Sequence, residues 1–333
     1  MTINSQQLQT LVNQWCPIVY LSANERYNPC TVDFYLENAA LCDSGGNVIV
    51  NAPVAEGNLP QAVSTDYLLP NSTAMAGEST APFYVRATIP ADNANAIDIE
   101  YWFFYGFNGN ATFRADIEIG SIKHNLLVPI PPFGDHQGDW EHAIVRLDDN
   151  FSFIGLYTAE HGWGTWNAAG SFQTGSDGRP IIYSAVNSHA SYVGTGVFTI
   201  KDPISIGFTG LKFQMGLADQ TDKGTLWDCL ANGCGAQIVS VTLPGVPDPA
   251  AEWTCFTGHF GSPTDQTSQI NAATHIIWEA IKDLTMHLAD PYKSKIEDTI
   301  KSILSDSAST MLPGGPASPN MQKDWTSGAP GQP

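Results

Sequence analysis

Positive charge is scarce in this chain. Its 333 residues include 14 lysines and arginines against 33 aspartates and glutamates, which gives a formal net charge of −19 at pH 7. A surface this negative repels the phosphates of nucleic acids and of anionic lipids, so neither is expected as an electrostatic partner. The excess of carboxylates instead suits a protein that binds cations.

Long apolar runs and a targeting signal are also missing. No window approaches the roughly 18 consecutive apolar residues of a membrane span, so the sequence predicts no transmembrane segment. The N-terminal residues MTINSQQ lack the basic start and the apolar core of a secretory signal peptide. We therefore expect a cytoplasmic protein, or one secreted without a recognisable signal. In the first case the six cysteines would be reduced thiols.

Strand-sized apolar runs dominate the chain, and helical periodicity is confined to its two ends. Residues 83–90 and 96–105 are typical of strands, while residues 5–15 and 271–311 have apolar side chains at helical spacing, interrupted at Pro291. The pattern predicts a mainly β protein, an antiparallel β-sandwich with an N-terminal helix and a C-terminal helical segment.

These runs divide the chain into four expected parts. They are an N-terminal helix (1–15), a β-sandwich domain (16–262), a helical segment (263–312) and a flexible tail (313–333). Within the sandwich domain, we expect a strand or strand-like turn at 32–36, long loops at 43–80, a turn at 106–110 and a strand at 204–213.

One run is difficult to explain as scaffolding: residues 134–142, GDHQGDWEH, in a chain of which only 14% is charged. A proline-rich loop precedes the run, and a β-branched strand follows it. If strand pairing has begun by Asp139, Asp139 and Glu141 share one face and Trp140 lies on the other. His136, on the preceding turn, can fold back toward the two carboxylates.

Carboxylates at the rim of an apolar layer need a counter-charge. We predict that His136, Asp139 and Glu141 share one divalent cation, with Asp135 or an oxygen of Asn108 or Asn110 as a further ligand. Carboxylate ligands favour Ca²⁺ or Mg²⁺, while the histidine keeps Mn²⁺, Zn²⁺ and Fe²⁺ open. The alternative for each residue by itself is a solvated acidic loop with local hydrogen bonds.

Several stretches resemble, in order, motifs of the Vps62 (vacuolar protein sorting-associated protein 62) family. Residues 101–108 (YWFFYGFN) are similar to its YWFFYPFN strand, and residues 134–142 to its GDHxGDWEH signature. Residues 186–192 (VNSHASY) are similar to its NGHASYP motif, and weaker similarities occur at 16–21, 160–162 and 253–261. The departures, such as glycine for the usual proline at Gly106, affect loop shape.

The signature also resembles the GHRHDWE heptad of necrosis- and ethylene-inducing (NLP) toxins. In those toxins His, Asp and Glu hold a divalent cation at the edge of a β-sandwich, as part of the recognition of glycosylated sphingolipids. The spacing His-x-x-Asp-x-Glu is matched here by His136, Asp139 and Glu141. The resemblance implies a cation at these three residues, although a further upstream acidic ligand of the toxins has no match at the same offset.

Three functions are compatible with these features. The first is a divalent-metal-dependent protein that recognises a glycan or a glycolipid head group, as a toxin or defence protein would. Aromatic faces suit a sugar, and the candidates for contacting it are Trp163, Trp166, Asn187 and Tyr192. Core packing is the alternative explanation of the aromatic side chains.

The second function is a metal-assisted hydrolase, with His161 or His189 as general acid or base and His142 as a further candidate. The Gly-x-Ser-x-Gly turn of serine hydrolases does not occur in the sequence. The third is an intracellular trafficking or scaffold protein, as the family name suggests. In either of the first two, we expect His161, Asn187 and His189 within about 10 Å of the cation, a typical pocket dimension.

Overall fold

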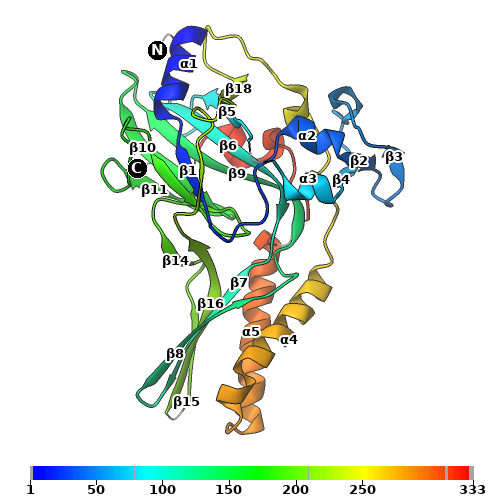
Figure 1. Ribbon diagram of the computed structural model, residues 1–333, viewed down its shortest axis with the longest axis vertical. Coiled ribbons are helices and arrows are strands. Elements are labelled where there is room, and N and C mark those ends of the chain that lie inside the picture. Colours follow the sequence, from blue (N-terminus) through cyan, green and yellow to red (C-terminus); the bar gives the residue numbers. More distant parts are fainter. Residues whose placement is uncertain (1–2, 79, 209, 312–313, 330–333) are drawn as a thin grey trace.

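The computed structural model describes residues 3–78, 80–208, 210–311 and 314–329, and two packed sheets form its core (Figure 1). The larger sheet has the strand order β11-β10-β9-β6-β5-β18, and the smaller one the order β13-β12-β1-β17. Strands are antiparallel to their neighbours except in the β5–β18 and β1–β12 pairs. The predicted class, mainly β with a sandwich core, is confirmed.

The strands of the larger sheet are β5 (Phe83–Thr88), β6 (Ile97–Asn108), β9 (His136–Leu147), β10 (Phe153–Glu160), β11 (Trp163–Ala168) and β18 (Ala236–Val241). Those of the smaller sheet are β1 (Ile18–Leu21), β12 (Ile181–Ser184), β13 (Ser191–Tyr192) and β17 (Thr225–Trp227).

Strand β6 is covered on both faces, because its sequence is apolar at successive positions. Tyr101 and Phe103 belong to the core that faces the smaller sheet, together with the helix α1 (Ser5–Trp15). Trp102 and Phe104 belong to a second apolar cluster on the other face. The strand continues through Gly106, where a Cβ atom would lie 1.9 Å from the carbonyl oxygen of Ala74. The turn predicted at 106–110 is therefore wrong in its first half.

A layer of short elements covers this second face. It contains a three-stranded sheet of β3 (Val48–Val50), β2 (Ala39–Cys42) and β4 (Tyr67–Pro70), and the helices α2 (Val32–Glu37), α3 (Ser72–Ala76), η1 (Glu56–Asn58) and η2 (Glu252–Cys255). The strand expected at 32–36 is thus a helix. The Thr31 hydroxyl caps it by accepting a hydrogen bond from the Phe34 amide at 3.0 Å. The predicted loops at 43–80 are interrupted by short strands and turns of helix.

A lobe projects from the sandwich and is seen at the bottom of Figure 1. Its sheet contains β7 (Thr112–Ile119), β8 (Ile122–Pro129), β14 (Gly196–Thr199), β15 (Ile204–Phe208) and β16 (Leu211–Thr221). The helices α4 (Gln266–Thr285) and α5 (Asp290–Met311) pack on it through a shared apolar cluster. The single strand predicted at 204–213 is therefore a β-hairpin, because β15 and β16 pair antiparallel with Phe208 opposite Leu211.

The two long helices confirm the C-terminal helical segment and the interruption at Pro291, which is the second residue of α5. None of the helices that the structure describes is long and apolar enough to cross a membrane. The six cysteines are free thiols, and the Sγ atoms of Cys16 and Cys229 lie 3.5 Å apart in the core.

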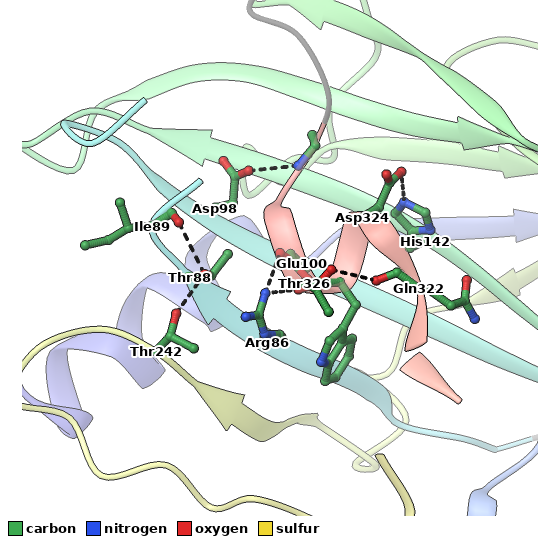
Figure 2. Close-up of polar contacts among 12 residues, drawn as sticks. Arg86, Thr88, Ile89, Asp98, Glu100, His142, Thr242, Gln322, Asp324 and Thr326 are labelled. Atoms are coloured by element: carbon green, nitrogen blue, oxygen red, sulfur yellow. Dashed lines mark hydrogen bonds and ion pairs between the residues drawn. The ribbon is translucent and has the colours of Figure 1, made fainter. Parts of the chain in front are cut away.

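The predicted flexible tail is packed against the sheet, as far as residue 329. After η3 (Pro319–Met321), the helix α6 (Lys323–Ser327) inserts Trp325, which is 1% exposed, against Trp102. Buried charges hold the surrounding backbone (Figure 2): Arg86 donates to the Trp325 carbonyl, and the Ala329 amide donates to Asp98 at 3.1 Å. The expectation of flexibility is wrong because one tryptophan anchors a segment rich in Gly, Ser and Pro.

We expect Trp325→Ala to lower the free energy of unfolding by about 3–5 kcal/mol, because it removes a fully buried indole and leaves a cavity beside Trp102. Urea denaturation followed by fluorescence measures the change. The control is Met321→Ala in the same segment, whose side chain is 58% exposed and whose loss should cost little. Equal stability of the two variants would show that the segment does not support the fold.

Candidate functional site

The acidic run forms the first half of β9, and its side chains alternate as predicted. Asp139 lies opposite Tyr105 and Glu141 opposite Phe103, on the face of the larger sheet that meets the smaller one. Trp140 belongs to the apolar cluster on the other face. Strand pairing already begins at His136, three residues before Asp139. The carboxylates therefore lie at the end of the sandwich core, 6% and 7% exposed.

His189 lies between two carboxylates. Its Nδ1 atom is 2.9 Å from Oδ2 of Asp139, and its Nε2 atom is 3.6 Å from Oε1 of Glu25, a distance of an ion pair without a hydrogen bond. The ring stacks on Tyr105 with 3.7 Å between centroids. Burial by itself would lower the pKa of His189, but Glu25 and Asp139 outweigh it and raise the pKa to about 9. His189 is therefore a buried cation at neutral pH.

Glu25 is fixed by the same contact and by the backbone. Burial would raise its pKa, but the charge of His189 and backbone amides lower it to about 2. One of these amides belongs to Asn187, whose N atom is 2.7 Å from Oε2 of Glu25. Asn187 and His189 both have a left-handed backbone, with φ of 67° and 56°. The segment is therefore a tight turn, which brings His189 inward.

A second histidine and carboxylate pair lies beside the first. The Nε2 atom of His161, on the β10–β11 turn, is 2.9 Å from Oδ2 of Asp219 on β16. Ser188 and Tyr192 donate hydrogen bonds of 2.7 Å to Asp219. Burial lowers the pKa of His161, but Asp219 outweighs it, so that the pKa lies above its ordinary value. Asp219 is an acid in a mostly apolar strand, a signal that the sequence analysis missed.

Glu141 is the carboxylate without a partner. No hydrogen bond or ion pair joins its side chain to another residue within the described part of the chain. Burial, followed by the charges of Asp139, Asp219 and Glu160, raises its pKa well above the usual range. The surroundings therefore disfavour the unpaired carboxylate form of Glu141.

His136 has one free ring nitrogen. Its Nδ1 atom lies 2.8 Å from the carbonyl oxygen of Gly138, and burial lowers the pKa of the ring. A neutral imidazole that donates from Nδ1 keeps a lone pair on Nε2, the tautomer that ligates metals. Asp135, on the loop before it, has a pKa raised by burial to about 6. The predicted ligands therefore each keep at least one oxygen or nitrogen atom that accepts no hydrogen bond from another described residue.

These residues form one electrostatic cluster, which we call the acid–histidine cluster. Its members each influence the ionisation of others, and they are Glu25, His136, Asp139, Glu141, Glu160, His161, His189 and Asp219. Among the residues that the structure describes, no three His, Cys, Asp or Glu side chains are arranged as a ready-made metal site. A cation at His136, Asp139 and Glu141 stays a prediction. Asn108 braces the preceding loop by donating to the Gly134 carbonyl at 2.7 Å.

The remaining candidates separate into two groups. Tyr192 belongs to the cluster through Asp219, and the Trp163 ring lies 6.0 Å from that of His161. His142 stacks on Trp102 and bonds Asp324 of the C-terminal segment, seen at the right of Figure 2. Trp166 contacts Tyr157 and Arg146 on that same face. His142 and Trp166 therefore lie across the sheet from Asp139, and their assignment to one site with it is corrected.

A cleft of about 530 Å³ opens beside the cluster. Its lining is mostly amide and hydroxyl side chains, among them Asn24, Asn110, Asn187, Gln220, Thr112 and Thr221. Tyr27 contributes an aromatic ring and Arg26 a guanidinium group. Asn187 connects the cleft to the cluster, because its amide binds Glu25.

The model of the family described as vacuolar protein sorting-associated protein 62 (Vps62) matches residues 1–328, nearly the whole chain. The chain belongs to the Vps62 family. It is 25% identical to vacuolar protein sorting-associated protein 62 of Saccharomyces cerevisiae over 301 residues, which cover 74% of this chain and 57% of that protein. It is 26% identical to the yeast protein TDA6 over 268 residues, 67% of this chain and 52% of that protein. The chain thus spans little more than half the length of these relatives.

Among solved structures, the chain is similar to NLPPya, a protein studied in complex with glucosamine. That structure shares 15% identity and a TM-score of 0.26, over 65% of this chain and 71% of the other. A mutant of NLPPya shares 14% identity and a TM-score of 0.30 with this chain, over 58% of this chain and 75% of the mutant's. Because these TM-scores are low, the similarity transfers neither a ligand nor a function to this chain.

We expect His189→Ala to lower the free energy of unfolding by about 3–5 kcal/mol in chelator-treated protein, because it leaves Asp139 and Glu25 buried without their counter-charge. The control is His275→Ala, an exposed histidine on α4. Urea denaturation at pH 7 measures both. A His189→Ala variant as stable as the control would contradict the role of His189 as the cluster's internal cation.

Proposed function

We propose that this protein binds a glycan or a glycolipid head group in a divalent-cation-dependent manner. The observation that carries the proposal is the Glu141 carboxyl group, which is 7% exposed, lacks a partner among the described residues and lies in the field of Asp139, Asp219 and Glu160. Evading this repulsion takes a proton or a bound cation. We favour the cation, because carboxyl groups with strongly shifted pKa values are concentrated at functional sites.

The donor types fit a divalent cation. Glu141 is unbonded, Asp139 uses Oδ2 for His189 and keeps Oδ1, and His136 keeps Nε2. His189 orients the Asp139 carboxylate, as an outer hydrogen-bond partner of a metal ligand does. Two carboxylates favour Ca²⁺ or Mg²⁺, and the imidazole also suits Mn²⁺, Zn²⁺ or Fe²⁺. The cation would offer a fixed positive charge to hydroxyl oxygens.

The cleft supports a sugar as the second ligand. Amides and hydroxyls can both donate to and accept from ring hydroxyls, and Tyr27 adds an aromatic surface. Its volume of about 530 Å³ is within the range of small-molecule pockets.

Binding is favoured over acid–base catalysis by His161 and His189. The His189 ring is wholly buried, stacks on Tyr105 and turns its two nitrogens toward Asp139 and Glu25. His161 directs Nε2 to Asp219. The carboxylates thus occupy Nδ1 of His189 and Nε2 of His161, and Nε2 of His189 is buried beside Glu25.

We expect millimolar Ca²⁺ or Mg²⁺ to raise the melting temperature of chelator-treated protein, and Glu141→Gln to abolish the rise. A ligand at 100 times its Kd stabilises the folded state by about 2.7 kcal/mol. The control is Asp283→Asn, an exposed acid on α4 that should respond like the wild type. Elemental analysis of the purified protein gives the metal. An equal rise in all three proteins would sink the assignment of Glu141.

We expect Val197→Trp to abolish glycan binding while leaving the cation-dependent rise intact, because Val197 lines the cleft and is 42% exposed. A glycan array with and without EDTA provides the measurement. Val48→Trp, at a residue 51% exposed on β3, is the matched control. Retained glycan binding in Val197→Trp would exclude the cleft as the sugar site.

A further inference from the structure

Among the five arginines of this acidic protein, Arg26 has no acidic partner within the described part of the chain. The other arginines pair with carboxylates in the fold, as Arg86 with Glu100, Arg114 with Asp116, Arg146 with Asp98 and Arg179 with Asp228. The Arg26 side chain makes no hydrogen bond or ion pair with any of the described residues. It is exposed and lines the cleft.

The backbone that carries Arg26 is held in place. The carboxylate of the neighbouring Glu25 accepts from the amides of Arg26 and Tyr27 at 2.8 and 2.9 Å. Glu25 itself points inward to His189, while Arg26 and Tyr27 line the cleft. The turn therefore presents a guanidinium and an aromatic ring to the cleft from a rigid base.

The one carboxylate in the cleft lining has other partners. Asp222 accepts from the Ser22 hydroxyl at 2.7 Å and from the Ala23 amide at 2.9 Å, one bond to each oxygen. These bonds brace the β1 end against β16 and β17. Arg26 is thus free to bind an anion that comes with a ligand, and the lining groups other than Arg26 and Asp222 are neutral.

We propose that the cleft binds an acidic sugar, a polyhydroxylated ring with a carboxylate or phosphate group that Arg26 holds. This deepens the proposed function and rests on the cleft being the sugar site. A guanidinium matches the two oxygens of a carboxylate or phosphate with parallel hydrogen bonds. The side-chain amides of Asn24 and Asn110 then bind the ring.

Arg26→Gln tests the proposal, with Lys223→Gln as the control. Lys223 is exposed, lies next to Asp222 in sequence and is not among the cleft-lining residues, so its loss removes the same charge near the cleft. Calorimetric titrations in Ca²⁺ compare glucose, glucuronate and glucose 6-phosphate. Both variants should keep the wild-type melting temperature, because both side chains are exposed.

We expect the wild type and Lys223→Gln to bind at least one acidic sugar about tenfold tighter than glucose, and Arg26→Gln to bind all three alike. The preference should shrink at 1 M salt. If glucuronate binds more tightly, the group that Arg26 holds is a carboxylate. If glucose 6-phosphate binds more tightly, the group is a phosphate.

Three results would overturn the proposal. Equal affinity of the wild type for the three sugars refutes it and leaves the proposed function standing. An equal loss in Arg26→Gln and Lys223→Gln shows general charge attraction and refutes a specific contact. Binding of no sugar at all refutes both. Conversely, acidic-sugar binding that needs Arg26 and persists in EDTA keeps this inference and refutes the dependence on a cation.

Discussion

The antiparallel pairing of β6 with β9 determines on which face of the larger sheet the buried charges of these two central strands lie. It places Asp139 and Glu141 beside Tyr105 and Phe103 on one face, and His142 beside Trp102 on the other. A slip by one residue would exchange the two faces and bury carboxylates among tryptophans. The Arg146 and Asp98 pair, fully buried with 2.7 Å between Nε and Oδ1, opposes such a slip, because it would separate the two charges.

Burying charged groups on both faces of the larger sheet costs desolvation free energy, and different partners offset it on each face. Beneath the C-terminal segment, Arg146 pairs with Asp98, and Arg86 pairs with Glu100, as Figure 2 shows for the second pair. In the acid–histidine cluster, His161 pairs with Asp219, His189 lies between Asp139 and Glu25, and Glu141 has no partner among the described residues. The first face is complete within the chain, which is what a structural network requires. The second leaves Glu141 without such a partner in the described part of the chain, which is the basis of the proposed cation.

Sequence reasoning succeeded where neighbours in the chain are neighbours in space. The alternation of Asp139, Trp140 and Glu141 and the break at Pro291 both follow from the local sequence. It failed where the partner is distant. The position of Asp219 in a mostly apolar strand marks it as unusual, but neither Asp219 nor Glu25 has a sequence neighbour that identifies its histidine partner. Residues 32–37 form a helix in spite of their strand-like apolar pattern, because Thr31 caps it. The C-terminal segment is ordered in spite of its composition, because Trp325 is buried.

The negative charge of the chain links the two proposals. With a net charge of −19, the protein repels an acidic ligand before any contact forms. Arg26 supplies one local positive charge at the cleft, and a cation at Glu141 would supply another beside it, connected through Asn187 and Glu25. Each charge lowers the electrostatic cost of the anion, so cation and acidic sugar would increase each other's affinity by the same factor. A neutral sugar would gain only its direct contact with the cation, and a charged one gains from the field as well.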